Sequence, residues 1–196
     1  VFPYLSIARE YEQAGAAAIS VLTEPEFFRG EDRYLTEIKE TVKIPVLRKD
    51  FTVDSYQIYE AKLFGADAVL IICSLHTPQT IAEYLEVCNT LGLSALVEAH
   101  TEAEIKNAVD AGARVIGVNN RDLKSFRVDT ERCVRMRKLV PSNILFVAES
   151  GIQNADDVRK MRQSGADAVL IGETLMRAPD KKRKLEELRC GLKSAD

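Results

Sequence analysis

Short apolar runs alternate with longer amphipathic segments along almost the whole chain. The phrase Gly-Ala-Asp-Ala-Val-Leu-Ile fills residues 65–71 and returns at residues 165–171, and looser versions occupy residues 14–22 and 111–118. Each copy carries a glycine that follows a segment of helical periodicity and precedes an apolar run. Because glycine readily adopts the left-handed conformation that ends many helices, each copy predicts a helix end followed by a strand.

A second series of apolar runs lies between these copies and begins at Ile44, Leu93 and Asn143. The runs are short and nearly continuous, which is typical of strands that are buried on both faces. The two series interleave along the chain. Together they predict strands at residues 17–22, 44–49, 67–73, 94–98, 114–119, 144–149 and 167–172.

The spacers between the runs carry apolar residues three or four positions apart, which is the spacing of one helix face. These faces are formed by Tyr34, Leu35 and Ile38; by Ile81, Tyr84, Leu85 and Val87; by Ile105, Ala108 and Val109; and by Val158 and Met161. A further helix is expected over residues 6–15. Buried strands that alternate with amphipathic helices indicate a parallel α/β sheet covered by helices.

The regular repeat predicts a (β/α)₈ TIM barrel, because one strand and one helix together take about 25 residues without a long insertion. Seven strands are found where such a barrel has eight, and the absent strand falls before Val1. We therefore expect residues 1–196 to form a single barrel domain that is N-terminally incomplete, with strands 2–8 present and strand 1 missing. The alternative is a seven-stranded doubly wound sheet, which needs no absent segment.

Composition limits the class of protein without changing this fold. Hydrophobic residues make up 46% of the 196 residues and charged residues 29%, as in ordinary soluble globular proteins. The net charge of −3 argues against a general nucleic-acid binder, and no apolar run approaches the length of a membrane helix. The four cysteines form no Cys-X-X-Cys pair and the two histidines have no zinc-site spacing. We therefore expect reduced thiols in a cytoplasmic protein, and no metal site.

Four polar residues stand where predicted strands end, namely Lys49, Glu98, Asn119 and Glu149. In a barrel, the carboxyl ends of the strands meet at one mouth, where catalytic groups lie. Strand residues alternate between faces, so each charged residue shares a face with apolar residues that precede it. A lysine beside carboxylates in different surroundings is typical of a proton-transfer site, so these four are the candidate catalytic residues. Each one taken singly also fits a solvated loop residue.

A candidate phosphate site follows the last two strands. Ser150 and Gly151 come after the seventh barrel strand, and Gly172 and Glu173 after the eighth. Small residues there allow backbone N–H groups to approach an anion at the start of a short helix, and these two loops bind phosphate in many barrels. Arg121 is a candidate charged donor from the neighbouring loop. The alternative for Arg121 is an ion pair with Asp122 or with Glu173.

Five segments carry a specific resemblance to one family. They are residues 45–51, 96–98, 116–123, 147–152 and 170–177. In order and spacing they resemble the indole-3-glycerol phosphate synthase family, and residues 21–30 are similar to the second strand and lid-like loop of that family. The most specific parts are the Leu-Arg-Lys-Asp-Phe and Asn-Asn-Arg-Asp-Leu segments.

The resemblance implies a carboxy-lyase of tryptophan biosynthesis that needs neither metal nor organic cofactor. Its small phosphorylated substrate would be 1-(2-carboxyphenylamino)-1-deoxyribulose 5-phosphate, which closes a ring and loses CO₂ and water to give indole-3-glycerol phosphate. Lys49 would be the acid, Glu98 its proton-transfer partner, and Asn119 would orient a substrate hydroxyl. Glu149 would position or stabilise cationic character, and the loop residues named above would hold the phosphate. Phe28 would pack on the aromatic ring, with a plain loop anchor as its alternative role.

The family also has a first strand that carries a glutamate, a lysine and a Ser-Pro-Ser segment, preceded by helices over the barrel mouth. None of this is found in the 196 residues, so we expect little turnover from the chain alone and self-association through unpaired strand edges. Two alternatives stay open: a barrel fragment that binds phosphate without catalysis, and another phosphate-binding barrel such as phosphoribosylanthranilate isomerase. The isomerase would use a Cys and Asp pair, and Cys73 ends a predicted strand without a matching Asp.

Overall fold

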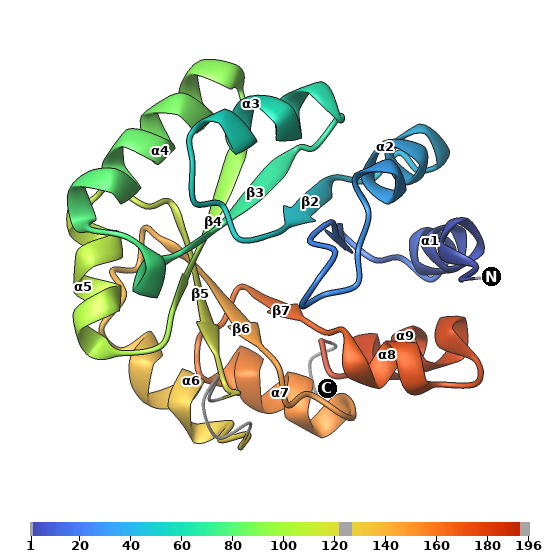
Figure 1. Cartoon of the computed structure of the whole chain (residues 1–196). Coiled ribbons are helices and arrows are strands. Elements are labelled where there is room, and N and C mark those ends of the chain that lie inside the picture. Colours follow the sequence, from blue (N-terminus) through green and yellow to red (C-terminus); the bar gives the residue numbers. More distant parts are fainter. Residues whose placement is uncertain (1, 122–126, 193–196) are drawn as a thin grey trace.

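Seven parallel strands form one curled sheet in the computed structural model, which describes residues 2–121 and 127–192 (Figure 1). The strands are β1 (Ile19–Leu22), β2 (Val46–Lys49), β3 (Ala68–Ile72), β4 (Ser94–Ala99), β5 (Val115–Asn119), β6 (Leu145–Glu149) and β7 (Ala168–Leu170). Each strand pairs with its neighbours in sequence order, and every pairing is parallel. A doubly wound sheet reverses its strand order at a switch point, so this unbroken order confirms the barrel prediction and excludes the alternative.

All seven predicted strands are present, and most begin a little later than the apolar run that predicted them. The reason is that the first residues of a run form hydrogen bonds with the C-terminal end of the preceding helix. Gly65 has a positive φ of 90°, and the next residue, Ala66, donates its N–H to Ala61 O over 2.9 Å. Gly165, in the second copy of the repeat, has a φ of 92° and the same kind of closure. The predicted glycine caps are therefore confirmed, and pairing in the sheet begins only after them.

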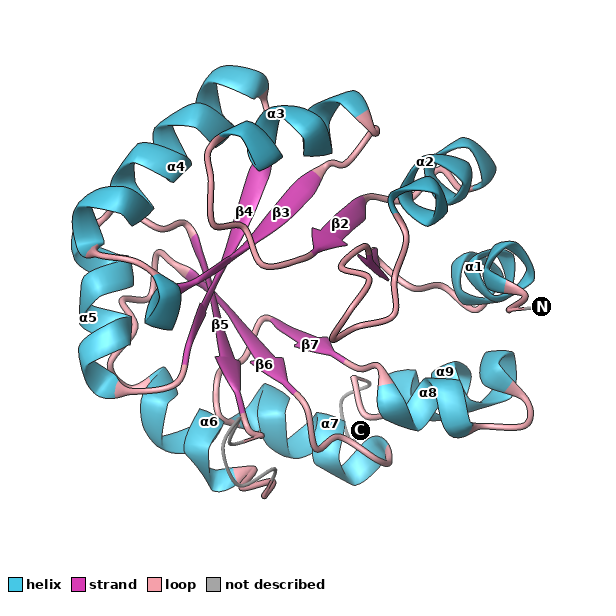
Figure 2. Ribbon diagram, viewed as in Figure 1, coloured by secondary structure: helices cyan, strands magenta, loops and turns pink. Residues whose placement is uncertain are grey.

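Helices surround the sheet on its outer side, as Figure 2 shows. They are α1 (Tyr4–Gln13), α2 (Asp32–Thr41), α3 (Tyr56–Leu63), α4 (Pro78–Leu91), α5 (Glu102–Asp110), α6 (Glu131–Arg137), α7 (Ala155–Gln163), α8 (Glu173–Arg177) and α9 (Lys181–Cys190), with a short 3₁₀ helix η1 (Cys73–Leu75). The expected helices over residues 6–15 and at the four apolar faces are confirmed as α1, α2, α4, α5 and α7. No particular helix was predicted at α3, because its apolar residues Tyr56, Tyr59 and Leu63 are exposed and obscure the buried face.

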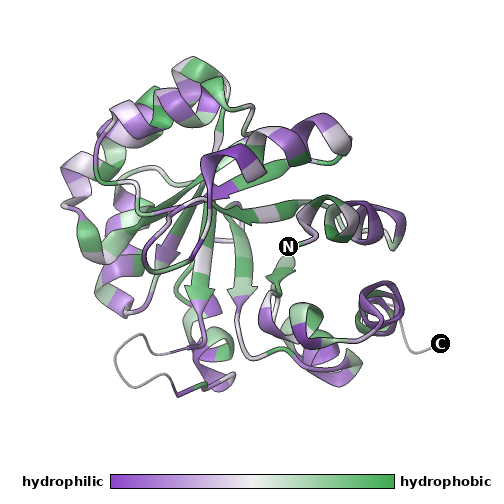
Figure 3. Cartoon of the chain, turned by 45° about the vertical axis from the view of Figure 1, so that its right-hand side comes forward, coloured by the Kyte–Doolittle hydropathy of each residue, from purple (hydrophilic) through white to green (hydrophobic). Residues whose placement is uncertain are grey.

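Two apolar layers lie on the two sides of the sheet. The larger layer packs strands against helices and includes the fully buried Leu35, Ile116 and Phe146. Figure 3 shows apolar residues along the strands and hydrophilic residues on the outer sides of the helices. The smaller layer fills the inside of the curled sheet, and its buried members are Leu47, Leu70, Ile72 and Leu96. Inward-facing side chains further along these strands lie above this inner layer, toward the carboxyl ends.

The two edges of the sheet are β1 and β7, which are not paired with one another in the described residues. The helices on the outer side connect these two edges, because α9, which follows β7, packs against α1, which precedes β1. Arg189 on α9 donates a hydrogen bond from Nη1 to Ala14 O over 2.8 Å. Gly15 leaves room for that side chain, since a Cβ at this position would lie 2.2 Å from Arg189 Nη1. Within residues 2–121 and 127–192, none of the helices has the length and apolar character that a membrane span requires.

Candidate active site

The four predicted catalytic residues meet at the carboxyl end of the sheet. Lys49 comes from β2, Glu98 from β4, Asn119 from β5 and Glu149 from β6. Glu98 and Glu149 are each 2% exposed, and Asn119 is 8% exposed. The Lys49 side chain is 20% exposed, so it is the member of the cluster that reaches solvent. The structure thus brings together residues that are up to a hundred positions apart in the sequence.

Glu98 is the centre of this cluster. Its Oε2 lies 3.8 Å from Lys49 Nζ, and its Oε1 accepts a hydrogen bond of 3.4 Å from Asn119 Nδ2. Burial by itself would raise the pKa of Glu98, but contact with His100 and the charge of Lys49 outweigh burial and lower that pKa to about 2. Glu98 is therefore an ionised carboxylate at neutral pH, although it is almost completely shielded from water.

Glu149 has the opposite protonation state. Burial raises the pKa of Glu149 well above its usual value, and the negative charge of Glu98 raises it further. The interaction between the two carboxyl groups lowers the pKa of Glu98 and raises the pKa of Glu149. No N–H or hydroxyl group in the described residues satisfies Glu98 Oε2 or Glu149 Oε1, so a proton on Glu149 is what satisfies the pair. A neutral carboxyl beside a charged one is the arrangement that acid–base sites use.

Gly117 makes room for this pair of carboxyl groups. It lies in the middle of β5, in register with Glu98 on β4. A Cβ at Gly117 would lie 2.0 Å from Glu149 Oε1 and 3.1 Å from Leu96 Cδ1. Any side chain at this position would displace Glu149. Our sequence prediction did not include Gly117, although a glycine inside an apolar strand is a known signal of close approach by another group.

His100 is a second residue of the cluster that the sequence prediction missed. It follows β4 directly and lies two positions after Glu98, so both side chains are on the same side of the strand. His100 Nε2 lies 3.0 Å from Glu98 Oε1, in an ion pair rather than an aligned hydrogen bond. Burial alone would lower the pKa of His100, but the carboxylates of Glu98 and Glu104 outweigh burial and raise that pKa. The sequence signal that could have identified His100 is the alternation of side chains along a strand, which places it on the same side as Glu98.

The loop after β6, at the candidate phosphate site, has an unusual backbone. Ser150 and Gly151 have positive φ values of 65° and 75°. Asn120, which is fully buried, ties this loop down by donating a hydrogen bond from Nδ2 to Ser150 O over 3.1 Å. Gly172, after β7, faces open space, since no atom lies within 4 Å of the place its Cβ would take. The role of Asn120 was not predicted, because the sequence does not show which backbone group the side chain of an asparagine near a strand end will contact.

Arg121 is paired with Glu173. Its Nη2 lies 2.6 Å from Glu173 Oε2, and the hydrogen bond and charge of Arg121 lower the pKa of Glu173. The Arg121 backbone N–H also donates to Asn119 Oδ1 over 3.0 Å, so the loop is attached to the cluster. The alternative pairing of Arg121 with Glu173 is therefore present, and the other alternative partner, Asp122, lies outside the described residues.

Phe28 lies beside the cluster, in the loop after β1. Its ring stacks on Phe51 with the ring centroids 4.8 Å apart, and Lys49 Nζ lies 5.5 Å from the Phe28 centroid. The Glu24 carboxylate holds the loop by accepting hydrogen bonds from the backbone N–H groups of residues 26, 27 and 28. Phe28 is thus anchored on Phe51 and at the same time covers the ammonium group of Lys49.

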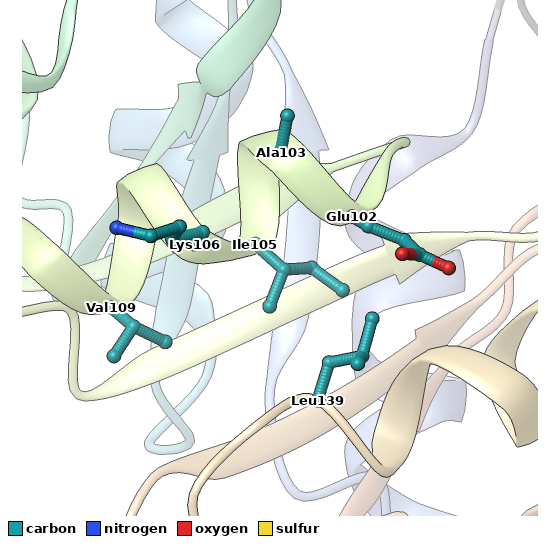
Figure 4. Close-up of a pocket in the computed structure, with 6 residues that line it drawn as sticks. All are labelled: Glu102, Ala103, Ile105, Lys106, Val109 and Leu139. Atoms are coloured by element: carbon teal, nitrogen blue, oxygen red, sulfur yellow. The ribbon is translucent and has the colours of Figure 1, made fainter.

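Away from this cluster, the described part of the chain has a surface groove but no metal-binding group of side chains. No group of three or more His, Cys, Asp or Glu side chains there is arranged to hold a metal ion. A groove lies on the outer side of the sheet, between α5 and the segment after α6 (Figure 4). It is lined by Glu102, Ala103, Ile105, Lys106, Val109 and Leu139. None of the candidate site residues lines this groove, so it is separate from the cluster around Glu98.

Comparison with known proteins identifies the family. The family model described as indole-3-glycerol phosphate synthase matches residues 2–188. The indole-3-glycerol phosphate synthase of Ruminiclostridium cellulolyticum is 61% identical over 188 residues, which cover 96% of this chain and 72% of the relative. The enzyme of the same name from Lachnoclostridium phytofermentans is 52% identical over 188 residues, covering 96% of this chain and 69% of the relative.

A solved structure supports the fold. The 3-hexulose-6-phosphate synthase from Salmonella typhimurium matches with a TM-score of 0.83 and 19% identity, covering 96% of this chain and 91% of that chain. At this identity the likeness concerns the barrel fold alone. The family model and the two relatives decide the identity, because they extend over nearly the whole chain and include all the candidate site residues. The chain belongs to the indole-3-glycerol phosphate synthase family of carboxy-lyases.

Proposed function

We propose that Lys49, Glu98, Asn119 and Glu149 carry out the ring closure, decarboxylation and dehydration that give indole-3-glycerol phosphate. The observation that carries this proposal is the pair of buried carboxyl groups, one ionised and one neutral, beside a lysine above an apolar layer. Such a cluster contains both a proton acceptor and proton donors in one shielded place, which the timed proton transfers of this reaction require.

The proposed steps use these groups in order. Lys49 donates a proton to the carbonyl oxygen of the sugar chain as the aromatic ring carbon forms its bond to the carbonyl carbon. The carboxyl group then leaves that ring carbon as CO₂, and the bonding electrons return to the ring. In the last step the new hydroxyl takes a proton from Glu149 and leaves as water, while Glu98 accepts a proton from the adjacent carbon. Asn119 orients a substrate hydroxyl beside Glu98.

The phosphate of the substrate is proposed to bind between the loops after β6 and β7. Backbone N–H groups of Ser150, Gly151, Gly172 and Glu173 are the proposed donors, and the Ser150 N–H would exchange its 3.4 Å contact with Leu170 O for the phosphate. The support is the positive φ of Ser150 and Gly151 and the open space at Gly172. Arg121 is the proposed charged donor, which would give up its ion pair with Glu173 and bind the phosphate instead. Phe28 would pack on the aromatic ring of the substrate next to Lys49.

The test is a comparison of turnover with stability in single variants. We expect Lys49→Ala and Glu98→Gln each to lower kcat by about 100-fold or more, because each removes a proton-transfer group. The matched control is Lys106→Ala, since this lysine is 76% exposed and pairs only with the nearby Asp110 in the described residues. Turnover is measured by the appearance of the indole product, and unfolding in urea is measured in parallel. Near-normal kcat in both site variants would refute the assignment.

A barrel that binds phosphate without catalysis is the second candidate function, and the unpaired β1 and β7 edges favour it. We propose that residues 1–196 form a single domain and that these edges allow self-association. The chain is assayed with and without a peptide that spans the first strand of the relatives. Turnover that requires the peptide would show that the peptide complements the chain. Turnover without the peptide would rule out the non-catalytic phosphate-binding barrel. Sedimentation velocity at several concentrations tests the association, and a single monomeric species throughout would contradict it.

The cytoplasm is the proposed location. The support is that all four cysteines are free, since none forms a disulfide bond. Secretion of the protein into an oxidising compartment, detected by fractionation of the cells that make it, would contradict this proposal.

A further inference from the structure

His100 is the buried titratable group next to the reaction site that the proposed steps leave unused. Only 13% of its side chain is exposed. Of the contacts that His100, Asn119 and Lys49 make with Glu98, the His100 contact is the shortest, at 3.0 Å against 3.4 Å for Asn119 and 3.8 Å for Lys49. Removal of His100 would therefore leave Glu98 with two long contacts and with the shared proton of Glu149.

Acidic groups hold the imidazole ring from both nitrogens. Glu98 Oε1 lies 3.0 Å from Nε2, and Glu104 Oε2 lies 3.6 Å from Nδ1. A neutral imidazole carries only one N–H, whereas the imidazolium carries a proton on each nitrogen and matches an acceptor on each side. The positions of the two carboxylates therefore select the cationic form of His100.

Glu104 is itself held in place. Its Oε2 accepts the backbone N–H of His100 over 2.6 Å, so one carboxylate contacts both the ring and the backbone of this residue. The Glu104 N–H donates to Thr101 Oγ1 over 3.2 Å at the start of α5, and Cys73 Sγ on η1 lies 3.7 Å from Glu104 O. The ring is thus attached to the first turn of a helix rather than to a free loop.

We propose that His100 is a positioning residue for Glu98, and that its cationic ring, held by Glu104, fixes the Glu98 carboxylate and keeps it ionised as the proton acceptor. This inference rests on the proposed function of Glu98. The charged and titratable groups that face His100 directly or through Glu98 are Glu98, Glu104, Arg132, Lys49 and Glu149. Arg132 opposes the cation, but the two carboxylates in contact with the ring outweigh it.

The first experiment compares His100→Asn and Glu104→Gln with the wild-type chain, in the presence of the first-strand peptide if turnover requires it. We expect kcat to fall about 10-fold or more in His100→Asn with KM changed little, because the base is displaced while the phosphate loops are intact. The acidic limb of the kcat/KM profile should move up by about one pH unit as the pKa of Glu98 rises. Glu104→Gln should give smaller changes in the same direction.

The matched control is His76→Asn, because His76 is the other histidine of the chain and contacts Thr52 O and Tyr84 rather than the cluster. Its kcat and pH profile should match those of the wild-type chain. A His100→Asn protein with wild-type unfolding behaviour, normal kcat and an unmoved acidic limb would overturn the inference.

The second experiment does not depend on turnover. Glu98 is followed by carbon-13 NMR during a pH titration of the wild-type chain and of His100→Asn, and the variant should show a higher pKa for Glu98. An equal pKa in both proteins would overturn the inference. If neither chain turns over with or without the peptide, the proposed function fails while this titration still decides the role of His100. If His100→Asn does not fold, the same titration in Glu104→Gln decides it.

Discussion

At the scale of single residues, the proposed chemistry of the site depends on two carboxyl groups of the same kind with opposite protonation. Glu98 has charged partners that compensate its burial, namely His100 and Lys49. Glu149 is buried beside a carboxylate, and the charge of Lys49 does not outweigh the effects of burial and of Glu98 on its pKa. The difference arises from neighbours, because desolvation acts on both groups in the same direction.

Gly117 allows the second carboxyl group to occupy its place, and Gly117→Ala tests this. We expect the substitution to destabilise the fold by about 1–3 kcal/mol and to lower kcat, because the new Cβ overlaps Glu149 Oε1. The measurement is the free energy of unfolding in urea, in the wild-type chain and in a Glu149→Ala background. The cost should be smaller in that background, where the overlapping carboxyl is gone. Equal costs in both backgrounds would show that Glu149 is not what Gly117 accommodates.

The raised pKa of Glu149 predicts a pH-dependent difference in stability. Above the ordinary pKa of a glutamate, the unfolded chain loses the proton of Glu149 while the folded chain keeps it. The free energy of unfolding therefore falls as pH rises through this window, by up to about 1.4 kcal/mol per pH unit from this group. Glu149→Gln removes this contribution, so the variant should gain stability relative to the wild-type chain as the pH rises from about 5 to about 8. The free energy of unfolding is measured in urea for both proteins at each pH. A difference between them that stays constant across that range would contradict the raised pKa of Glu149.

At the scale of elements, each site residue depends on how a strand ends and how the next helix begins. α7 begins directly after the proposed phosphate loop with a capping box, in which Asn154 accepts N–H groups of α7 and Asp157 accepts the N–H of Asn154. The Asp157 carboxylate also accepts the backbone N–H of Gln153 over 2.8 Å. This start of α7 therefore limits the movement of the loop that carries Ser150 and Gly151.

Asn154→Ala tests the contribution of that cap. We expect a loss of about 1 kcal/mol in the free energy of unfolding, because an N-cap side chain satisfies N–H groups that the helix leaves unpaired. KM for the substrate should rise more than kcat falls, since Asn154 lies next to the proposed phosphate loop. The control is Asn154→Ser, which keeps an accepting oxygen and should restore most of both properties. A fall in kcat at constant KM would argue against the phosphate assignment of this loop.

At the scale of the whole molecule, the sheet has a protected centre and two edges with a single strand partner each. β3 and β4 are almost entirely buried, whereas all residues of β7 are partly or fully exposed. The contact of α9 with α1 joins the two ends of the helical layer, but it does not provide hydrogen-bond partners to the strand edges.

Hydrogen exchange measures this gradient directly. We expect backbone amides of β3 and β4 to exchange more slowly than those of β1 and β7, because strands that are buried and paired on both sides open only in larger unfolding events. The measurement is exchange followed by mass spectrometry of peptides from each strand. Protection of β7 equal to that of β4 would mean that its edge is covered in solution, for example by self-association.

Much of the fold was predictable from local pattern. The interleaved apolar runs and the amphipathic spacers between them correctly predicted all seven strands, their parallel order and five helices. This was possible because burial of one side of a helix, or of a whole strand, fixes the spacing of apolar residues within that element. The strand ends also located Lys49, Glu98, Asn119 and Glu149, since parallel strands bring their carboxyl ends to one side. The helix α3 was not predicted, because its exposed aromatic residues disguise its buried face.

The sequence by itself determined the alternation of strands and helices, the polar residues at the strand ends and the family. Only the tertiary structure decided that Glu149 is neutral and Glu98 charged, that Gly117 gives the space for the pair, and that His100 lies against it. The physical reason is that periodicity is a property of neighbouring residues, whereas the protonation of a buried group depends on distances to side chains from other strands.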